Sequence, residues 1–250
     1  MDIDRAMLAA CHEGNAPPTL RLYGWSAPTL TVGYSQRSWE GIDREKCREL
    51  NIPVVLRPTG GRALLHHSEM TYSIVSPIPH ASFPCGLMES HKTISGALLM
   101  SLAEMGMKGA KLAPTRPPLF DRKTSSPACF ASRNHCEIVI DNKKLIGSAQ
   151  RRTNKAFLQH GSVLIDCDLK SLNSLFEFNS SEDRTRNLEA LIQRTTTLNE
   201  LLEREVAFEE VMEAFKKGFQ KFFVGQWQSG QISSYEKSTQ KEQDIPVPGH

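Results

Sequence analysis

The sequence predicts an α+β fold in which a mixed, largely antiparallel sheet is flanked by helices. Strand-like runs occupy the first two thirds of the 250 residues, and helical, polar patterns dominate from about residue 169 onward. Short turn-forming segments at 26–28 and 141–144 separate neighbouring strand-like runs, as hairpins do. Strands first and helices last indicate α+β. We expect a single domain over residues 1–227 and a polar, flexible tail over 228–250, which lacks apolar periodicity.

The individual elements follow from periodicity and from capping residues. Residues 3–13 place Ile3, Ala6, Met7, Ala10 and Cys11 on one helical face. Asp43 is expected to open a helix over 43–51, and the helix over 90–106 is expected to begin with Ser90 as its cap and to stop at Gly106. Strands are expected at 20–25, 29–35, 52–56, 69–75, 135–141, 143–152 and 156–165, a long loop at 113–128, and helices at 169–178, 181–193 and 197–223.

Charge and cysteine content exclude several classes of function. Thirty basic and 28 acidic residues leave a net charge of +2, so the overall balance indicates no surface for nucleic acid. No window approaches the roughly 18 apolar residues that a membrane span needs. Six cysteines lie scattered, without a CxxC pair or zinc-ligand spacing, which disfavours structural disulfides and a zinc site. We therefore expect a cytoplasmic protein, monomeric by default, that binds neither membrane nor nucleic acid.

The segment "RPTGGRALLHHSEMTYS", residues 57–73, is the first candidate site. Two adjacent glycines between strands usually form only a turn, because glycine reaches positive φ without steric cost. In the competing interpretation, Gly60 and Gly61 leave a bare backbone wall against which a ligand lies, with Arg57, Arg62 and His66 close by.

Two further stretches carry reactive side chains. Cys129 ends the long loop in "SSPACFASRNHCEIVI", although most free cysteines are simply small buried hydrophobes. Lys144 lies three residues before Gly147 and Ser148 in "DNKKLIGSAQ", although a lysine at the start of a hairpin is normally a solvated edge residue. None of these patterns is decisive alone.

Together the motifs resemble one superfamily. "RPTGGRALLHHSEMTYS", "ACF" followed by an acid, "KKLIGSAQRR" and "LQHGSVLI" occur in the order and spacing of the lipoate-protein ligase and octanoyltransferase superfamily, over roughly residues 1–225. The closest resemblance is to its cysteine-dependent octanoyltransferases. It implies a biotin/lipoate protein ligase-like fold and transfer of an octanoyl group from octanoyl acyl carrier protein to the lysine of a lipoyl domain. That acceptor is the glycine cleavage H protein or the acyltransferase subunit of a 2-oxoacid dehydrogenase.

The resemblance also assigns roles to residues. Cys129 matches the catalytic cysteine, and Lys144 matches the lysine that would favour its thiolate. Backbone N–H groups near Gly60 and Gly61, or around Gly147 and Ser148, could stabilise the oxyanion of the tetrahedral intermediate. Arg57 would orient the carrier or its phosphate, and His160 would line the pocket. The reaction needs no metal and no cofactor.

Three alternatives remain at this point. An ATP-dependent lipoate ligase would carry an aspartate where this chain has His135. An amidotransferase would move octanoyl between lipoyl domains with the same cysteine and pocket. A non-catalytic acyl-binding module would lack the nucleophile or the lysine, and both are present. His67, where relatives have aspartate, and Cys136, where an aromatic residue is common, depart from the transferase pattern.

Overall fold

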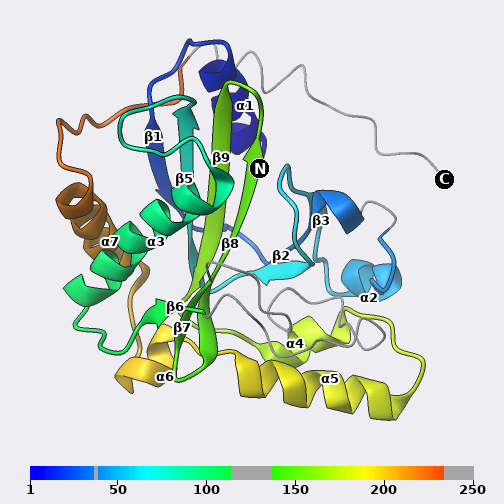
Figure 1. Cartoon of the computed structure of the whole chain (residues 1–250). Coiled ribbons are helices and arrows are strands. Elements are labelled where there is room, and N and C mark those ends of the chain that lie inside the picture. The colour runs from blue at the N-terminus through cyan, green and yellow to red at the C-terminus, as the bar shows by residue number, and fades with distance from the viewer. Residues whose placement is uncertain (37–38, 114–136, 234–250) are drawn as a thin grey trace.

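The computed structural model describes residues 1–36, 39–113 and 137–233, and its elements are arranged around two sheets (Figure 1). The strands are β1 (Thr19–Tyr23), β2 (Thr29–Val32), β3 (Val54–Leu56), β4 (Leu64–His66), β5 (Glu69–Pro77), β6 (Lys111–Leu112), β7 (Ile138–Ile140), β8 (Lys143–Arg152) and β9 (Ala156–Leu164). The helices are α1 (Asp2–His12), α2 (Arg44–Glu49), α3 (Leu87–Glu104), α4 (Leu169–Ser174), α5 (Ser181–Arg194), α6 (Leu198–Leu202) and α7 (Phe208–Phe222), with a 3-10 turn at Tyr34–Gln36.

The pairing of the strands confirms the predicted mixed, largely antiparallel sheet. The large sheet has the order β1-β5-β9-β8-β7-β6, and every neighbouring pair in it is antiparallel. The small sheet has the order β3-β2-β4, in which β2 and β3 are parallel and β2 and β4 antiparallel. No helix in the described ranges combines the length and apolar composition that crossing a membrane would require.

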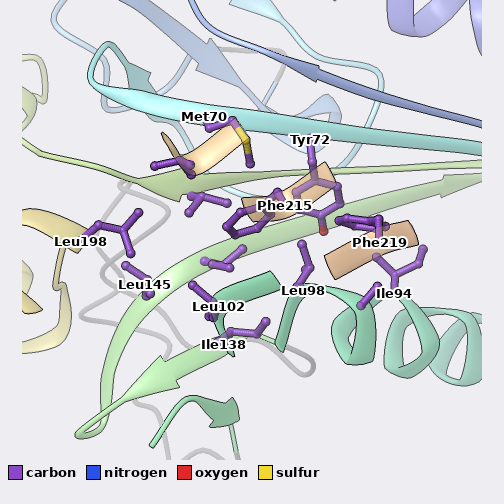
Figure 2. Packing of buried hydrophobic residues seen from close by; sticks show 14 of the residues in the cluster. Met70, Tyr72, Ile94, Leu98, Leu102, Ile138, Leu145, Leu198, Phe215 and Phe219 are labelled. Carbon is purple, nitrogen blue, oxygen red and sulfur yellow. The ribbon is translucent and has the colours of Figure 1, made fainter. Parts of the chain in front are cut away.

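One face of the large sheet is apolar and carries the main core. Met70, Tyr72 and Ile74 alternate along β5 toward α3 and α7, where they pack with residues such as Leu98 and Phe219 (Figure 2). This period of two is the pattern of a strand with differently covered faces. Figure 1 shows α3 and α7 side by side over this face.

The middle of the opposite face of the large sheet is polar, while Val75, Ala156 and Leu158 form an apolar cluster with α1 at one end of it. The intervening residues of β5, Glu69, Thr71 and Ser73, are buried on this face, and His160 of β9 pairs with Ser73. We call it the polar face. Helix α1 covers its upper part in Figure 1, and the small sheet with α4 and α5 forms a second apolar cluster beside it. Polar side chains are therefore held between two apolar layers, where each needs a hydrogen-bond partner.

A β-bulge changes which face the start of β8 presents. Ile146 pairs with Ile138, but the next pair joins Lys144 to Val139, so Leu145 is the extra residue. Leu145 and Ile146 both belong to the main core, and Figure 2 shows Leu145 among the core side chains. A bulge shifts the alternation by one residue. Lys144 consequently shares the polar face with Gly147, which simple alternation along the sequence does not predict.

Most predicted elements are confirmed, with four main differences, the first being that the two-residue strand β6 (Lys111–Leu112) was not predicted. The helix expected at 90–106 begins at Leu87 with Gly86 as its N-cap, so Ser90 was wrongly predicted as the cap; its hydroxyl donates to the Leu87 carbonyl inside the first turn. Strand β4 lies inside the glycine motif and was not predicted. The helical stretch at 197–223 is divided at Glu203, whose φ of 52° is left-handed.

Several predicted turns and caps are present as expected. Asp43 accepts a hydrogen bond from the N–H of Lys46 at 2.8 Å. Asp141 and Asn142 both have positive φ, as the two-residue hairpin turn between β7 and β8 requires. Gly106, with φ of 75°, ends α3. The loop predicted at 113–128 lies outside the described residues apart from its first residue, as does most of the tail predicted at 228–250, so the domain boundary at 227 stays a prediction.

Candidate active site

A narrow hollow on the polar face brings together six residues singled out in the sequence. Its volume is about 40 Å³. Its walls include the predicted residues Arg57, Gly61, His66, Gly147, Ser148 and His160, together with Met1, Leu64, Thr71, Ala149, Gly161 and Ser162. The "RPTGGRA", "GSAQ" and "LQHGS" blocks, far apart in the chain, thus meet at one place.

The glycine loop is held in place by Arg57 and by close backbone packing. Gly61 has φ of 96°, a conformation that side chains rarely allow. The Arg57 guanidinium is buried and donates to the carbonyls of Gly60 and Arg62, at 3.1 Å and 2.6 Å from Nη2, and to Thr31. Gly60 and Arg62 thus accept hydrogen bonds from Arg57 through their backbone carbonyls. Neither residue lines the hollow.

A chain of hydrogen bonds continues from Arg57 to His66 and Glu69. The Thr31 hydroxyl lies 2.7 Å from Nε2 of His66, and Nδ1 of His66 lies 2.7 Å from Oε1 of Glu69. Nδ1–H of His66 donates to the Glu69 carboxylate, and Arg57 donates to the Thr31 hydroxyl at the other end of the chain. Trp25 stacks on the imidazole at 4.2 Å between ring centroids. His66 is thereby held in one orientation.

Glu69 is the buried anion that closes this chain. Its Oε1 also accepts hydrogen bonds from Thr71 at 2.7 Å and from Ser162 at 2.8 Å. Burial alone would raise the pKa of Glu69, but the interaction with His66 and the two hydroxyl donors lower it below its ordinary value. A buried carboxylate therefore lies behind the hollow.

His160 is held by Asp4, a residue that the sequence did not single out. Nε2 of His160 lies 2.6 Å from the Thr59 hydroxyl, and Nδ1 lies 3.3 Å from Oδ2 of Asp4. Asp4 is fully buried and also accepts from Arg21 and Tyr23 at 2.9 Å each. Burial opposes ionisation, but the hydrogen bond and charge of His160, followed by Arg21, hold the pKa of Asp4 well below its usual range.

Burial acts on the pKa of His160 in the opposite direction to its effect on the pKa of Asp4. Desolvation lowers the pKa of His160, although the hydrogen bond to Asp4 works against that shift. Because the Asp4 carboxylate can only accept, Nδ1–H of His160 donates to it. No local sequence signal would have shown that Asp4, near the start of α1, contacts a histidine 156 positions later.

Gly147 and Ser148 lie where β8 pairs with β9. Gly147 is opposite Ser162, and Ser148 is opposite Gly161. The Ser148 hydroxyl is 2.6 Å from the hydroxyl of Tyr72, which accepts from Gln159 at 3.0 Å. These contacts fix the strand edge whose backbone the hollow exposes.

Lys144 is buried rather than solvated, so the alternative of an edge lysine is wrong. It is 2% exposed, and its Nζ lies 2.5 Å from Oε1 of Glu137, which is 1% exposed. Lys144 does not line the hollow but shares its polar face through the bulge described above. Glu137 was noted in the sequence only as an acid after "ACF".

Other predicted residues lie elsewhere. Cys129, His135 and Cys136 lie outside the described residues. His67 lines a separate, open cavity of about 640 Å³ with Trp25, Glu69 and Asp166. Across the described ranges, no three His, Cys, Asp or Glu side chains are grouped as a metal ion would require.

Comparisons with known proteins identify the family of this chain. The family model of the lipoyl protein ligase A/B catalytic domain matches residues 1–220. An octanoyltransferase LipM of Kyrpidia tusciae is 37% identical over 246 residues, 97% of this chain and 89% of that protein. An octanoyltransferase LipM of Staphylococcus aureus is 33% identical over 223 residues, 88% of this chain and 81% of that protein.

Solved structures share the fold at lower sequence identity. A bipartite lipoate protein ligase of Thermoplasma acidophilum aligns with a TM-score of 0.75 and 21% identity, covering 96% of this chain and 86% of that one. A lipoate-protein ligase A bound with ATP aligns with a TM-score of 0.73 and 21% identity, covering 96% and 88%. With a family model spanning most of the sequence and relatives well above 30% identity, this chain belongs to the lipoyl protein ligase A/B catalytic domain family.

Proposed function

We propose that this protein is an octanoyltransferase of protein lipoylation. The observation that carries the proposal is the convergence of the three motif blocks on one hollow of the polar face, in a chain whose relatives bear the name octanoyltransferase. The proposed donor is octanoyl acyl carrier protein, and the proposed acceptor is the lysine of a lipoyl domain. We place the reaction in the cytoplasm, carried out by a monomer.

The proposed reaction has two steps through a thioester. The Cys129 thiolate attacks the carbonyl carbon of the donor thioester, and the donor thiol leaves and takes up a proton, which gives an octanoyl-Cys129 enzyme. The neutral amine of the acceptor lysine then attacks the same carbonyl carbon. An amide forms, the Cys129 thiolate leaves, and the amine releases a proton to water.

The described residues support the binding part of this proposal. Arg57, His66 and His160 have their polar atoms occupied by hydrogen bonds within the protein. What they leave toward the hollow is glycine backbone and apolar surface, which suits an alkyl chain. The hollow is smaller than the roughly 300–1,000 Å³ usual for ligand sites, so the glycine loop has to move outward when the acyl chain enters.

Arg57 was expected from the sequence to orient the carrier or its phosphate, and its hydrogen bonds in the structure favour a different role. Its guanidinium is only 5% exposed and donates to the loop carbonyls. We therefore propose that Arg57 shapes the loop and does not contact the phosphate of the carrier.

The proposal is tested by the intact mass of the protein after mixing with octanoyl acyl carrier protein without ATP. We expect a gain equal to one octanoyl group, reversed by hydroxylamine and absent in Cys129→Ser. If no adduct forms, and a lipoyl domain gains an octanoyl group only from free octanoate, Mg²⁺ and ATP, the protein is a ligase. An adduct formed only from octanoylated H protein would identify the amidotransferase.

A further inference from the structure

A second cavity opens at the end of the large sheet where β5 begins and β9 ends. Its walls come from the β1–β2 connection, the β4–β5 turn, the end of β9 and the segment 199–209 at α6 and the start of α7. Its volume of about 640 Å³ lies within the roughly 300–1,000 Å³ usual for small-molecule sites. We call it the acidic cavity, because Glu69, Asp166, Glu205 and Glu209 line it.

The charge of the acidic cavity differs from that of the whole chain. The sequence has 30 basic and 28 acidic residues, a nearly even balance. Among the residues that line the cavity, four are carboxylates and none is a lysine or an arginine; His67 is the one side chain of a basic type. Carboxylates gathered around one open space repel one another, so a cation placed between them would be attracted. The wall carboxylates that face solvent, however, could equally be neutralised by salt.

Glu69 is the observation that points to a ligand, because one of its two oxygens is orphaned. Its side chain is 1% exposed. Oε1 accepts hydrogen bonds from three residues that all line the hollow, namely His66, Thr71 and Ser162. Glu69 itself lines the acidic cavity and not the hollow. Oε2 is buried and has no hydrogen-bond partner among the described residues. Since Oε1 is held on the side of the hollow, Oε2 is left on the side of the acidic cavity.

A buried carboxylate oxygen without a donor is costly to the folded protein. The three hydroxyl and imidazole donors of Glu69 are all used on Oε1, so they do not offset this cost. A donor that entered from the acidic cavity would complete the set. An ammonium group suits this place, since it carries three N–H donors and a positive charge.

The walls of the acidic cavity are tied together by hydrogen bonds. The Ser68 carbonyl accepts from the N–H of Ile165 at 3.1 Å and of Asp166 at 2.9 Å. The N–H of Asn199 donates to the Ile165 carbonyl at 3.0 Å, and its Oδ1 accepts from the N–H of Val206 at 2.9 Å. The cavity is therefore preformed, which reduces the cost of ordering it around a ligand.

Aromatic rings complete the lining. Trp25 and Phe208 both line the acidic cavity. A Cβ at Gly24 would lie 3.1 Å from Cε2 of Phe208, so the absence of a side chain lets this ring lie against the backbone. Aromatic faces attract organic ammonium ions. No three His, Cys, Asp or Glu side chains in the described ranges are grouped as a metal ion requires, so the composition favours an organic cation.

We propose that the acidic cavity binds an alkylammonium ion of the linear polyamine class, with the Glu69 carboxylate as its buried anchor. Glu205 and Glu209 attract the remaining positive charges at the solvent side. Because Oε2 is buried, side chains of the wall have to turn aside as the ammonium enters. This site does not depend on the proposed octanoyl transfer.

The test is calorimetric titration of the full chain with spermidine at constant ionic strength. We expect saturable binding of one spermidine per chain. Glu69→Gln removes the charge of the anchor and should weaken binding roughly 10- to 100-fold, the usual effect of losing a charged hydrogen bond. Glu205→Gln and Glu209→Gln should each weaken it about 2- to 5-fold, as expected for solvent-exposed ion pairs. Glu213→Gln, on α7 but outside the cavity, is the matched control and should leave the affinity unchanged.

A second titration distinguishes the two sources of this chemistry. A blocked peptide with two lysines should bind more weakly than spermidine if the natural ligand is a free polyamine. Equal or tighter binding of the peptide, lost in the same variants, would assign the cavity to lysine side chains of a protein and would overturn the polyamine assignment.

Three outcomes would overturn the site itself. They are the absence of saturable binding, equal displacement of spermidine by Mg²⁺ at the same ionic strength, and an affinity that none of the cavity variants changes. If circular dichroism shows that Glu69→Gln does not fold, the double variant of Glu205→Gln and Glu209→Gln decides instead, because both side chains are exposed. It should then weaken spermidine binding by the product of the two single effects.

Discussion

Gly33 is predicted to be indispensable because the glycine loop packs directly on it. A Cβ at this position would lie 1.9 Å from the Gly61 carbonyl oxygen and 3.0 Å from the Gly60 carbonyl carbon. Both neighbours are backbone, which no rotamer change can move. Contacts under about 3.0 Å are not tolerated, so Gly33→Ala must move the loop by at least 1.1 Å, the difference between 3.0 Å and 1.9 Å.

Moving the glycine loop would weaken the hydrogen bonds that hold it. The N–H of Tyr34 donates to the Thr59 carbonyl at 2.9 Å, and Arg57 holds the Gly60 carbonyl. Overpacking of this kind costs about 1–3 kcal/mol, and one weakened hydrogen bond adds about 1 kcal/mol. We expect the free energy of unfolding to fall by about 2–4 kcal/mol. We also expect kcat/KM to fall by roughly 10²-fold, the usual effect of misplacing a site by 1 Å.

Urea denaturation and octanoyl transfer measure the two effects separately. Gly60→Ala is the matched control for stability, because a Cβ there meets nothing within 4 Å. Its free energy of unfolding should stay within about 0.5 kcal/mol of the wild type. A Gly33→Ala protein with wild-type stability and wild-type kcat/KM would refute the argument that the loop's position depends on this contact.

Two further substitutions probe the polar networks. Tyr72→Phe removes the hydroxyl that contacts Ser148 and accepts from Gln159, so urea denaturation should show a loss of about 1–3 kcal/mol from the buried amide left without its acceptor. Asp4→Asn should lower the free energy of unfolding at pH 7, because the carboxylate that holds His160 is lost. Since the folded-state pKa of Asp4 is below its unfolded value of 3.8, its stabilisation is present above pH 3.8 and is lost as the pH falls further. The stability curves of wild type and variant should therefore converge below about pH 4, and parallel curves would contradict the ionised state assigned to Asp4.

The sequence predicted the elements of the fold better than the contacts between them. Apolar periodicity located most strands, and Asp43, Gly106 and the 141–142 turn act through their own local conformation, which short segments reveal. Strand β4 was missed because Leu64–His66 form only a three-residue strand within the glycine motif, and they do so by pairing with β2. The start of α3 was misplaced because Ser90 is a good capping type whose hydroxyl turns inward instead.

In the candidate site, too, local features were predicted and long-range contacts were not. Residues within recognisable motifs, such as Arg57, His66 and His160, were found. Asp4 and Gly33 were not, because their roles depend on partners far along the chain. Lys144 was identified by motif, but the face of the sheet on which it lies follows from a bulge, which is a property of strand pairing and leaves no trace in the sequence.

The polar face is compatible with the apolar ligand that the proposed function requires. A sheet covered on both sides would ordinarily present apolar residues to both layers. Here His66, Glu69, His160 and Asp4 are buried instead; His66 and Glu69 are 2.7 Å apart, His160 and Asp4 are 3.3 Å apart, and Oε2 of Glu69 has no hydrogen-bond partner among the described residues. Because the ring nitrogens of both histidines are already paired, a polar ligand would have to break existing hydrogen bonds to reach them. An alkyl chain makes no such demand, so we expect it to displace the glycine loop on entry while the hydrogen bonds of the two histidines remain intact.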